Sequence, residues 1–278
     1  NSSFNPCLFP QENLSLDLLE SFIEYFLEKD YVFISPEDLL KEDLSPGVKY
    51  GMLTFDDGYF NNTWSLELLN KYGIPAVFFI TTNLILKEEK QWSDVIFYER
   101  WKQGVPEEKI KREIYQKIPN RIADIRDYIT REFGTRSFTP VGDSDRIMSE
   151  SELKAFAENR LVHIGNHTHT HEALGYLSVP EIQRELQTSQ DELRRITGGE
   201  PSIIAYPYGS VSDAVVAEAS SLGFEFGATT RHHKNSLPIP GDSRMLLNRF
   251  NPVVARGTFD YATFRSPFRL KSTLKKLL

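Results

Sequence analysis

The chain of 278 residues, with 40% hydrophobic and 26% charged residues, has the size and composition of a globular protein, which excludes wholesale disorder. Its net charge of -7 argues against a nucleic-acid partner, because neutralising phosphates needs a basic face, and no stretch reaches the roughly 18 apolar residues of a transmembrane helix. The single cysteine, Cys7, excludes intrachain disulfides.

The first part of the chain alternates predicted helices and strands. Residues 14–29 carry apolar side chains at helical spacing, whereas residues 76–80 are apolar throughout, which is typical of a parallel strand covered on both faces. Ser35 and Pro36 start one helix, and Gly73 ends another. The predicted elements are helix 14–29, strand 31–34, a helix from Ser35, strand 48–55, helix 63–72 and strand 76–80.

The alternation of helices and strands stops between residues 88 and 148, where charged helical segments replace the strands. Segments 107–118 and 123–133 have helical patterns, and no buried strand is evident, so we expect a helical insertion. Its aromatic residues suit either a wall that stacks on sugar rings or a satellite core, and the core is the favoured interpretation. These residues are Trp92, Phe97, Tyr98 and Trp101.

Helices and strands alternate again after the insertion. Ser149 and Ser178 each open a capping box with the glutamate three residues on. Repeated strand–helix units predict an α/β fold with a parallel sheet, in a single domain spanning residues 1–278. A tail at 262–278 holds a basic, apolar cluster from Arg265 to Lys276, which suits an anionic surface but is more simply a solvated end. The predicted strands are 161–165, 203–206, 226–230 and 246–250, and the helices are 150–157, 179–196 and 214–222.

Two adjacent carboxylates, Asp56 and Asp57, follow the strand at 48–55 directly. Neighbouring carboxylates repel each other unless a cation lies between them or one keeps its proton. A metal ion is one explanation. The simpler alternative is a turn, because Asp-Gly after a strand is common in hairpins. Taken alone, this pair leaves both interpretations open.

A histidine cluster at the end of another predicted strand favours the metal. On a helical turn, His167 and His171 would share one face, while His169 would point away from both. With Asp57 they form a set of two imidazoles and one carboxylate, which leaves coordination positions for water and substrate. We expect one divalent ion, with zinc favoured and cobalt, manganese, iron or nickel compatible. His163 is interpreted as a packed residue.

Three motifs together resemble the polysaccharide deacetylases of the NodB-homology group of carbohydrate esterases. The first family motif, T-F-D-D-G, is present at residues 54–58, and the second, H-[S/T]-x-x-H, is present at residues 167–171. The third ends in P-Y-G and matches residues 207–209. Their order and spacing also agree, and the similarity covers nearly the whole chain.

The resemblance implies a distorted, incomplete (β/α) barrel that hydrolyses N-acetyl groups of amino sugars with the help of a metal ion. By position, Asp56 would be the general base, and Asp57, His167 and His171 the metal ligands. The backbone N–H of Tyr208 would stabilise the oxyanion.

Two departures from the family pattern concern the base and the acid. Many relatives have an arginine that orients the base two residues before the motif's proline, where this chain has Ala205. Arg249 is the candidate replacement, with a structural arginine as the equal alternative. The late Leu-x-His motif that supplies the general acid is not evident, and neither His232 nor His233 is a favoured substitute.

The predicted function is therefore removal of N-acetyl groups from an amino-sugar polysaccharide or glycan precursor, with an acetylated carbohydrate as the partner. A catalytically weak carbohydrate-binding or scaffold protein is one alternative, and a hydrolase of a non-sugar amide is another. The lack of a leader in the printed chain and the one cysteine favour the cytoplasm, with export as an alternative. No sequence feature specifies the oligomeric state.

Overall fold

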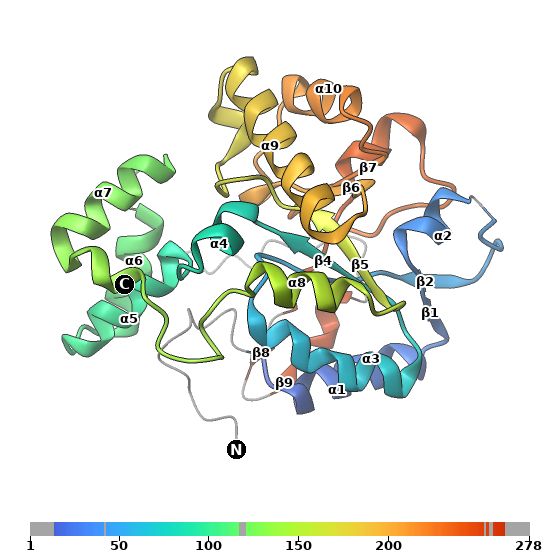
Figure 1. The fold of residues 1–278 in the computed structure, drawn as a ribbon. Helices are drawn as coiled ribbons and strands as arrows, with labels where there is room; N and C mark the ends of the chain where they lie inside the picture. The colour runs from blue at the N-terminus through green and yellow to red at the C-terminus, as the bar shows by residue number, and fades with distance from the viewer. Residues whose placement is uncertain (1–13, 42, 117–120, 253, 256–257, 265–278) are drawn as a thin grey trace, which may run out of the picture.

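Five parallel strands form the centre of the protein. The computed structural model describes residues 14–41, 43–116, 121–252, 254–255 and 258–264, so the basic cluster predicted at 265–276 lies outside the described residues. The strands lie in chain order and curl into a half-barrel surrounded by helices (Figure 1), which confirms the predicted α/β fold and incomplete barrel. They are β3 (Leu53–Phe55), β4 (Ala76–Ile80), β5 (Val162–Asn166), β6 (Ile203–Ala205) and β7 (Phe226–Ala228).

The predicted helices around the sheet are present, with bounds that differ from the predicted ones by a few residues, and the short helix that follows β4 is additional. Capping boxes form at Ser35, Ser149 and Ser178, and Gly73 and Gly198 end their helices in the left-handed conformation. Among the described residues, no helix is long and apolar enough to cross a bilayer. The helices are α1 (Leu16–Leu27), α2 (Pro36–Leu40), α3 (Leu66–Tyr72), α4 (Thr82–Lys87), α8 (Glu150–Ala157), α9 (Val179–Thr197) and α10 (Asp213–Ser221).

Short 3-10 helices and two small sheets complete the described structure. The β1–β2 pair is parallel, and the β8–β9 pair is antiparallel. The strands are β1 (Tyr31–Phe33), β2 (Lys49–Gly51), β8 (Val254–Ala255) and β9 (Thr258–Phe259). The 3-10 helices are η2 (Phe60–Ser65), η3 (Thr135–Phe138), η4 (Leu174–Tyr176), η5 (Pro207–Gly209), η6 (Gly241–Leu246) and η7 (Tyr261–Phe264).

Two strand predictions were wrong in detail. The single strand predicted at 48–55 is divided at Met52, because β2 pairs with β1 while β3 pairs with β4, and apolar patterning cannot tell which neighbour each half joins. The strand predicted at 246–250 is reduced to one parallel bridge between Leu247 and Ala228. The next ladder bond would run from the backbone N–H of Arg249 to the carbonyl of Thr229, but that carbonyl accepts Nε of the Arg249 side chain instead, at 3.2 Å.

All five residues of the central strand β4 are buried, which explains why its sequence is apolar throughout. Phe78 packs in the cluster under α1, α3 and α8, whereas Phe79 points into the barrel interior. On the next strand, a Cβ at Gly165 would lie 2.4 Å from the Phe79 ring, so only glycine fits there. Both faces of the sheet are thus packed tightly.

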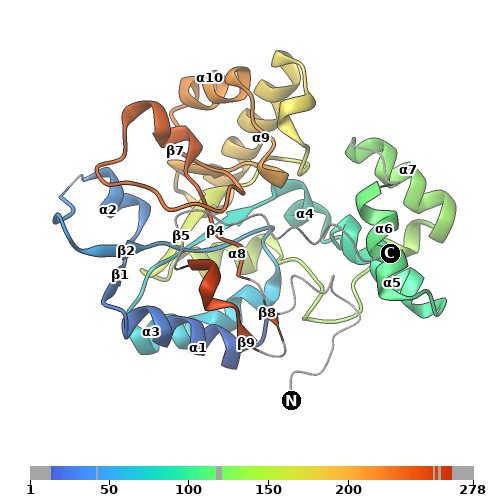
Figure 2. The same ribbon diagram turned by 180° about the vertical axis from the view of Figure 1, so that it is seen from behind.

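The helical insertion between β4 and β5 is also confirmed. Its helices lie to one side of the barrel in both views (Figures 1 and 2) and have an apolar core of their own. Phe97 lies inside that core and Trp92 packs against it, as the core interpretation predicts, while Trp101 is exposed. A fully buried ion pair between Lys90 and Asp145, 3.1 Å apart, ties the two ends of the insertion together. The helices are α5 (Trp92–Lys102), α6 (Glu107–Gln116) and α7 (Ile122–Phe133).

Candidate active site

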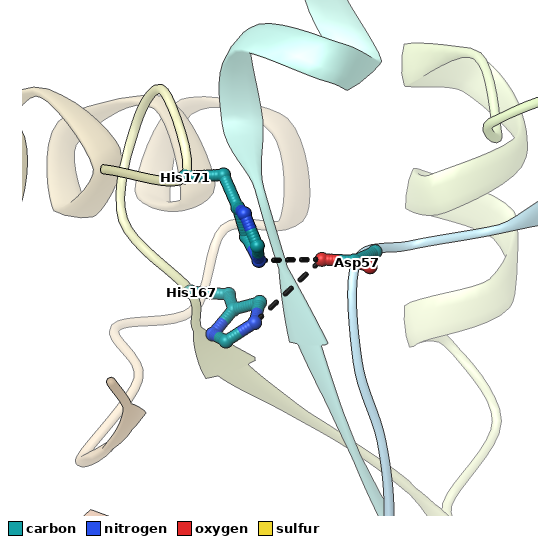
Figure 3. A group of neighbouring side chains, drawn as sticks. All are labelled: Asp57, His167 and His171. Carbon is teal, nitrogen blue, oxygen red and sulfur yellow. Dashed lines mark ion pairs between the residues drawn. The ribbon is translucent and has the colours of Figure 1, made fainter. Parts of the chain in front are cut away.

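Three potential metal ligands meet at the carboxyl ends of β3 and β5, as expected for a parallel sheet. Oδ1 of Asp57 lies 3.1 Å from Nε2 of His171 and 3.6 Å from Nε2 of His167. Figure 3 shows the carboxylate facing both rings from the opposite side of the site. One ligand atom from each residue lies within 4.8 Å of the others, and all three residues are buried. This spacing suits a single ion.

The chemistry of the Asp57, His167 and His171 side chains fits a bound metal ion. Among the described residues, no hydrogen bond reaches the buried Oδ1 of Asp57, and an unpartnered buried carboxylate oxygen is costly. An ion between this oxygen and the two imidazoles would remove the cost, and nitrogen and oxygen donors of this kind suit zinc and similar divalent ions.

The loops that carry these ligands have unusual backbone geometry. Four of the six described non-glycine residues with positive φ lie here: Asp57 (73°), Thr168 (66°), His171 (66°) and Tyr208 (59°). The predicted helical turn at 167–171 is therefore wrong, because left-handed residues, rather than one helical face, turn the imidazoles of His167 and His171 toward each other. Such conformations cost about 1–3 kcal/mol each and persist only where neighbouring contacts hold them.

A network of buried polar side chains holds the histidine loop. Oδ1 of Asn166 accepts a hydrogen bond from the N–H of Thr168 at 2.8 Å, and the Asn166 amide donates to Gln190 at 3.1 Å. Glu185, on α9, accepts the backbone N–H groups of His169 and Thr170 at 3.1 and 2.8 Å. The loop conformation is thus fixed from β5 and α9.

Burial and neighbouring charges keep the ligand groups in the protonation states that a metal needs. Burial would raise the pKa of Asp57, but the imidazoles of His171 and His167 outweigh it and lower the pKa to about 2. For His167, burial is the main cause and lowers the pKa, so the ring is neutral at neutral pH. Its Nδ1 lies 2.7 Å from the carbonyl oxygen of Ala205, which accepts the N–H and leaves the lone pair of Nε2 facing Asp57.

Asp56 lies beside this group and is held by Arg249. Nη1 and Nη2 of Arg249 donate to the two carboxylate oxygens at 2.7 and 2.9 Å, and Nε donates to the carbonyl of Thr229 at 3.2 Å. Burial would raise the pKa of Asp56, but Arg249 and His167 lower it, so the carboxylate is ionised at neutral pH. Its side chain is 36% exposed, against 12% for Asp57, so Asp56 is the carboxylate more open to the groove.

Comparison with known proteins identifies the family to which this site belongs. The family model for polysaccharide deacetylases matches residues 44–227. The chain belongs to this family. The resemblance predicted from the three motifs is thereby confirmed.

Two curated Bacillus subtilis proteins of the polysaccharide deacetylase family resemble the chain. The peptidoglycan-N-acetylmuramic acid deacetylase PdaC is 26% identical over 130 residues, which is 46% of this chain and 27% of PdaC. The polysaccharide deacetylase YxkH, whose assignment is provisional, is 20% identical over 215 residues, which is 76% of this chain and 56% of YxkH. The chain therefore spans about a quarter of one relative and about half of the other.

Solved structures of polysaccharide deacetylases have a similar fold. The de-N-acetylase from Aggregatibacter actinomycetemcomitans superposes with a TM-score of 0.61 at 16% identity, covering 90% of each chain. At that identity the likeness concerns the fold alone.

The remaining singled-out residues lie near the ligands or pack elsewhere. His169 bonds to Thr82 at 2.9 Å and points away from the ligand group, which confirms that prediction. His163 pairs with Glu37 at 2.8 Å, and Tyr206 is fully buried. The ring of Tyr208 lines the groove beside the site.

Sequence reasoning missed the contacts that the insertion makes with the site. Nε1 of Trp92 donates to the hydroxyl oxygen of Tyr208 at 3.0 Å, and that oxygen lies 2.9 Å from Nδ1 of His171. The side chain of Gln91 neighbours Asp57 and contributes to lowering the pKa of that carboxyl. The available signal was weak: both residues follow a short helix that starts at the carboxyl end of β4, where a parallel sheet gathers its functional side chains.

Proposed function

We propose that this protein is a metal-dependent hydrolase that removes N-acetyl groups from an amino-sugar polysaccharide. The observation that carries the proposal is an ionised Asp56, clamped by Arg249, next to the buried group of Asp57, His167 and His171. Membership of the polysaccharide deacetylase family supports a sugar polymer as the substrate. The name of PdaC, an N-acetylmuramic acid deacetylase, supports an N-acetyl amide as the bond that is cleaved.

Asp57, His167 and His171 would hold the ion, with zinc as the favoured metal. When bound, a divalent ion of this kind polarises the amide oxygen and lowers the pKa of water toward neutrality. The protein supplies the neutral imidazole of His167, whose pKa is lowered by burial, and the ionised carboxylate of Asp57, whose pKa the neighbouring imidazoles lower.

Asp56 would act as the general base. Its carboxylate lies 3.9 Å from Nε2 of His167 and so faces the space where water would attack. The two bonds from Arg249 fix its orientation and keep it ionised, ready to take a proton. Arg249 would thereby replace the arginine that many relatives have where this chain has Ala205.

The oxyanion that forms as water adds to the amide carbon needs a donor besides the ion. The backbone N–H of Tyr208, in the strained turn η5 beside His171, would supply it. A groove of about 1990 Å³ contains Asp56, Asp57, both histidines, Tyr208 and Arg249, and an opening of that size suits a polymer rather than a small enclosed substrate.

Acetate release tests the proposal. Zinc-loaded protein is incubated with chitin oligosaccharides, peptidoglycan and a β-linked N-acetylglucosamine polymer, and we expect acetate from at least one. Metal-stripped protein should release none, and Asp56→Asn should be slower by about 100-fold or more while still binding zinc. Asp124→Asn, on the exposed face of α7, is the matched control and should behave as wild type.

Three results would contradict the proposal. Zinc binding without acetate release from any glycan would favour the carbohydrate-binding alternative, and release from a simple N-acetyl amide alone would favour a non-sugar hydrolase. Full activity of Asp56→Asn would remove the assigned base.

A further inference from the structure

The start of the helical insertion reaches one of the three ligand residues. Trp92 is the first residue of α5 and lies two residues after Lys90, whose fully buried ion pair with Asp145 holds this part of the chain in place. The side chain of Trp92 therefore starts from a fixed backbone.

Trp92 acts on His171 through the hydroxyl of Tyr208. Nε2 of His171 faces Asp57, so this is the nitrogen that can bind an ion, and Nδ1 must then carry the hydrogen. That hydrogen can be donated to the Tyr208 oxygen, 2.9 Å away. An indole N–H only donates, so the same oxygen accepts the N–H of Trp92 at 3.0 Å. The phenol oxygen thus receives two N–H groups. Trp92 therefore holds the Tyr208 oxygen at the position where it can accept the Nδ1–H of His171.

The other imidazole ligand, His167, is held by the barrel itself, through the carbonyl of Ala205. We propose that Trp92 is a positioning residue that holds His171 for the metal ion through the Tyr208 hydroxyl, so that the helical insertion sets how tightly the ion binds. The inference rests on the proposed metal site. It adds that a residue outside the three family motifs determines the affinity of that site.

Zinc affinity measured by competition with a chromophoric chelator tests the role of Trp92. Groups that support a ligand from outside typically change metal affinity by about 10- to 100-fold. We expect the zinc Kd to rise by about 10-fold or more in Tyr208→Phe and by roughly 3- to 10-fold in Trp92→Phe. The double variant should bind no more weakly than Tyr208→Phe, because Trp92 acts through that hydroxyl. Trp101→Phe, an exposed tryptophan on the same helix, is the control and should match wild type.

Thermal unfolding separates the role of Trp92 from a merely structural one. The gain in melting temperature on adding zinc should shrink in Trp92→Phe. A merely structural role would instead lower the melting temperature of the metal-free and zinc-loaded forms equally.

The outcomes separate this inference from the proposed function. If wild-type protein takes up no zinc, the metal-dependent function and the inference both fail. If wild type binds zinc and Trp92→Phe binds it equally tightly, only the inference fails. Additive losses in the double variant of Trp92 and Tyr208 would overturn the assigned route from Trp92 to His171.

Discussion

The barrel and the helical insertion contribute to the site in different ways. The barrel supplies the reactive groups, because the carboxyl ends of β3 and β5 bring Asp57 and His167 to the same edge of the sheet. The insertion has a separate apolar core and supplies the neutral side chain of Trp92, which reaches the ligand His171 through the Tyr208 hydroxyl. The comparison teaches that strand topology brings the reactive groups together, while an attached segment can adjust how tightly they bind a metal ion.

The largest effect is expected from replacing a metal ligand that the barrel supplies. Asp57→Asn keeps the size of the side chain and tolerates the positive φ, but it removes the ligand's charge. We expect zinc to be lost on gel filtration and acetate release to fall by more than about 100-fold, since even supporting residues cost up to that much. Metal analysis and an acetate assay measure both. Zinc content equal to that of Asp124→Asn would contradict the assignment.

A smaller effect, on stability, is expected where the insertion joins the barrel. Asp145→Asn leaves the ammonium group of the fully buried Lys90 without its partner, and breaking a buried pair costs about 3–5 kcal/mol. Urea unfolding measures the loss. The exposed pair of Asp191 and Arg194 gives the matched control, Asp191→Asn, which should cost less than about 1 kcal/mol.

A combined variant sharpens this test. Lys90→Met with Asp145→Asn removes both charges and should recover part of the stability that Asp145→Asn alone loses. Equal losses in Asp145→Asn and Asp191→Asn would show that the buried pair does not fasten the insertion.

The smallest effect is expected at Arg249, which positions the base without touching the ligands. Arg249 lowers the pKa of Asp56, so removing it in Arg249→Met raises that pKa. Asp56 is then protonated at a higher pH, and the acidic limb of the kcat/KM profile moves upward in pH. Activity at the optimum should fall by about 10- to 100-fold through loss of orientation, while zinc affinity stays unchanged, in contrast to Trp92→Phe.

The pH profile of Arg231→Met gives the reference for Arg249→Met, because Arg231 is exposed and lies two residues beyond Thr229. An acidic limb that stays in place in Arg249→Met would mean that Asp56 is not the base whose ionisation limits the rate.

Much of the barrel could be predicted because its information is local. The apolar run of β4, the capping boxes and the strand-end motifs each act over a few residues, and parallel strands then bring Asp57, His167 and His171 together. The pairing was predictable although the local conformation was not: spacing of four residues favours a helix, and only the polar contacts of Asn166 reveal a left-handed loop.

The insertion could be predicted only as a set of helices. That its first two residues reach the site depends on how it packs, which helical periodicity does not encode. The bond between Arg249 and Asp56 spans 193 residues of sequence, and the sequence alone leaves a structural role for this arginine equally open. Long-range contacts of this kind follow from the assembled barrel.

The left-handed backbone of the ligand loops has a practical consequence for protein design. Grafting Asp57, His167 and His171 alone onto another scaffold would transfer the donor atoms without the forces that bend their chain segments. Asn166 and Glu185, which receive the N–H groups of the histidine loop, would have to travel with them. The smallest set of residues that could be transferred to another scaffold is therefore the three ligands together with the two side chains that hold their loop.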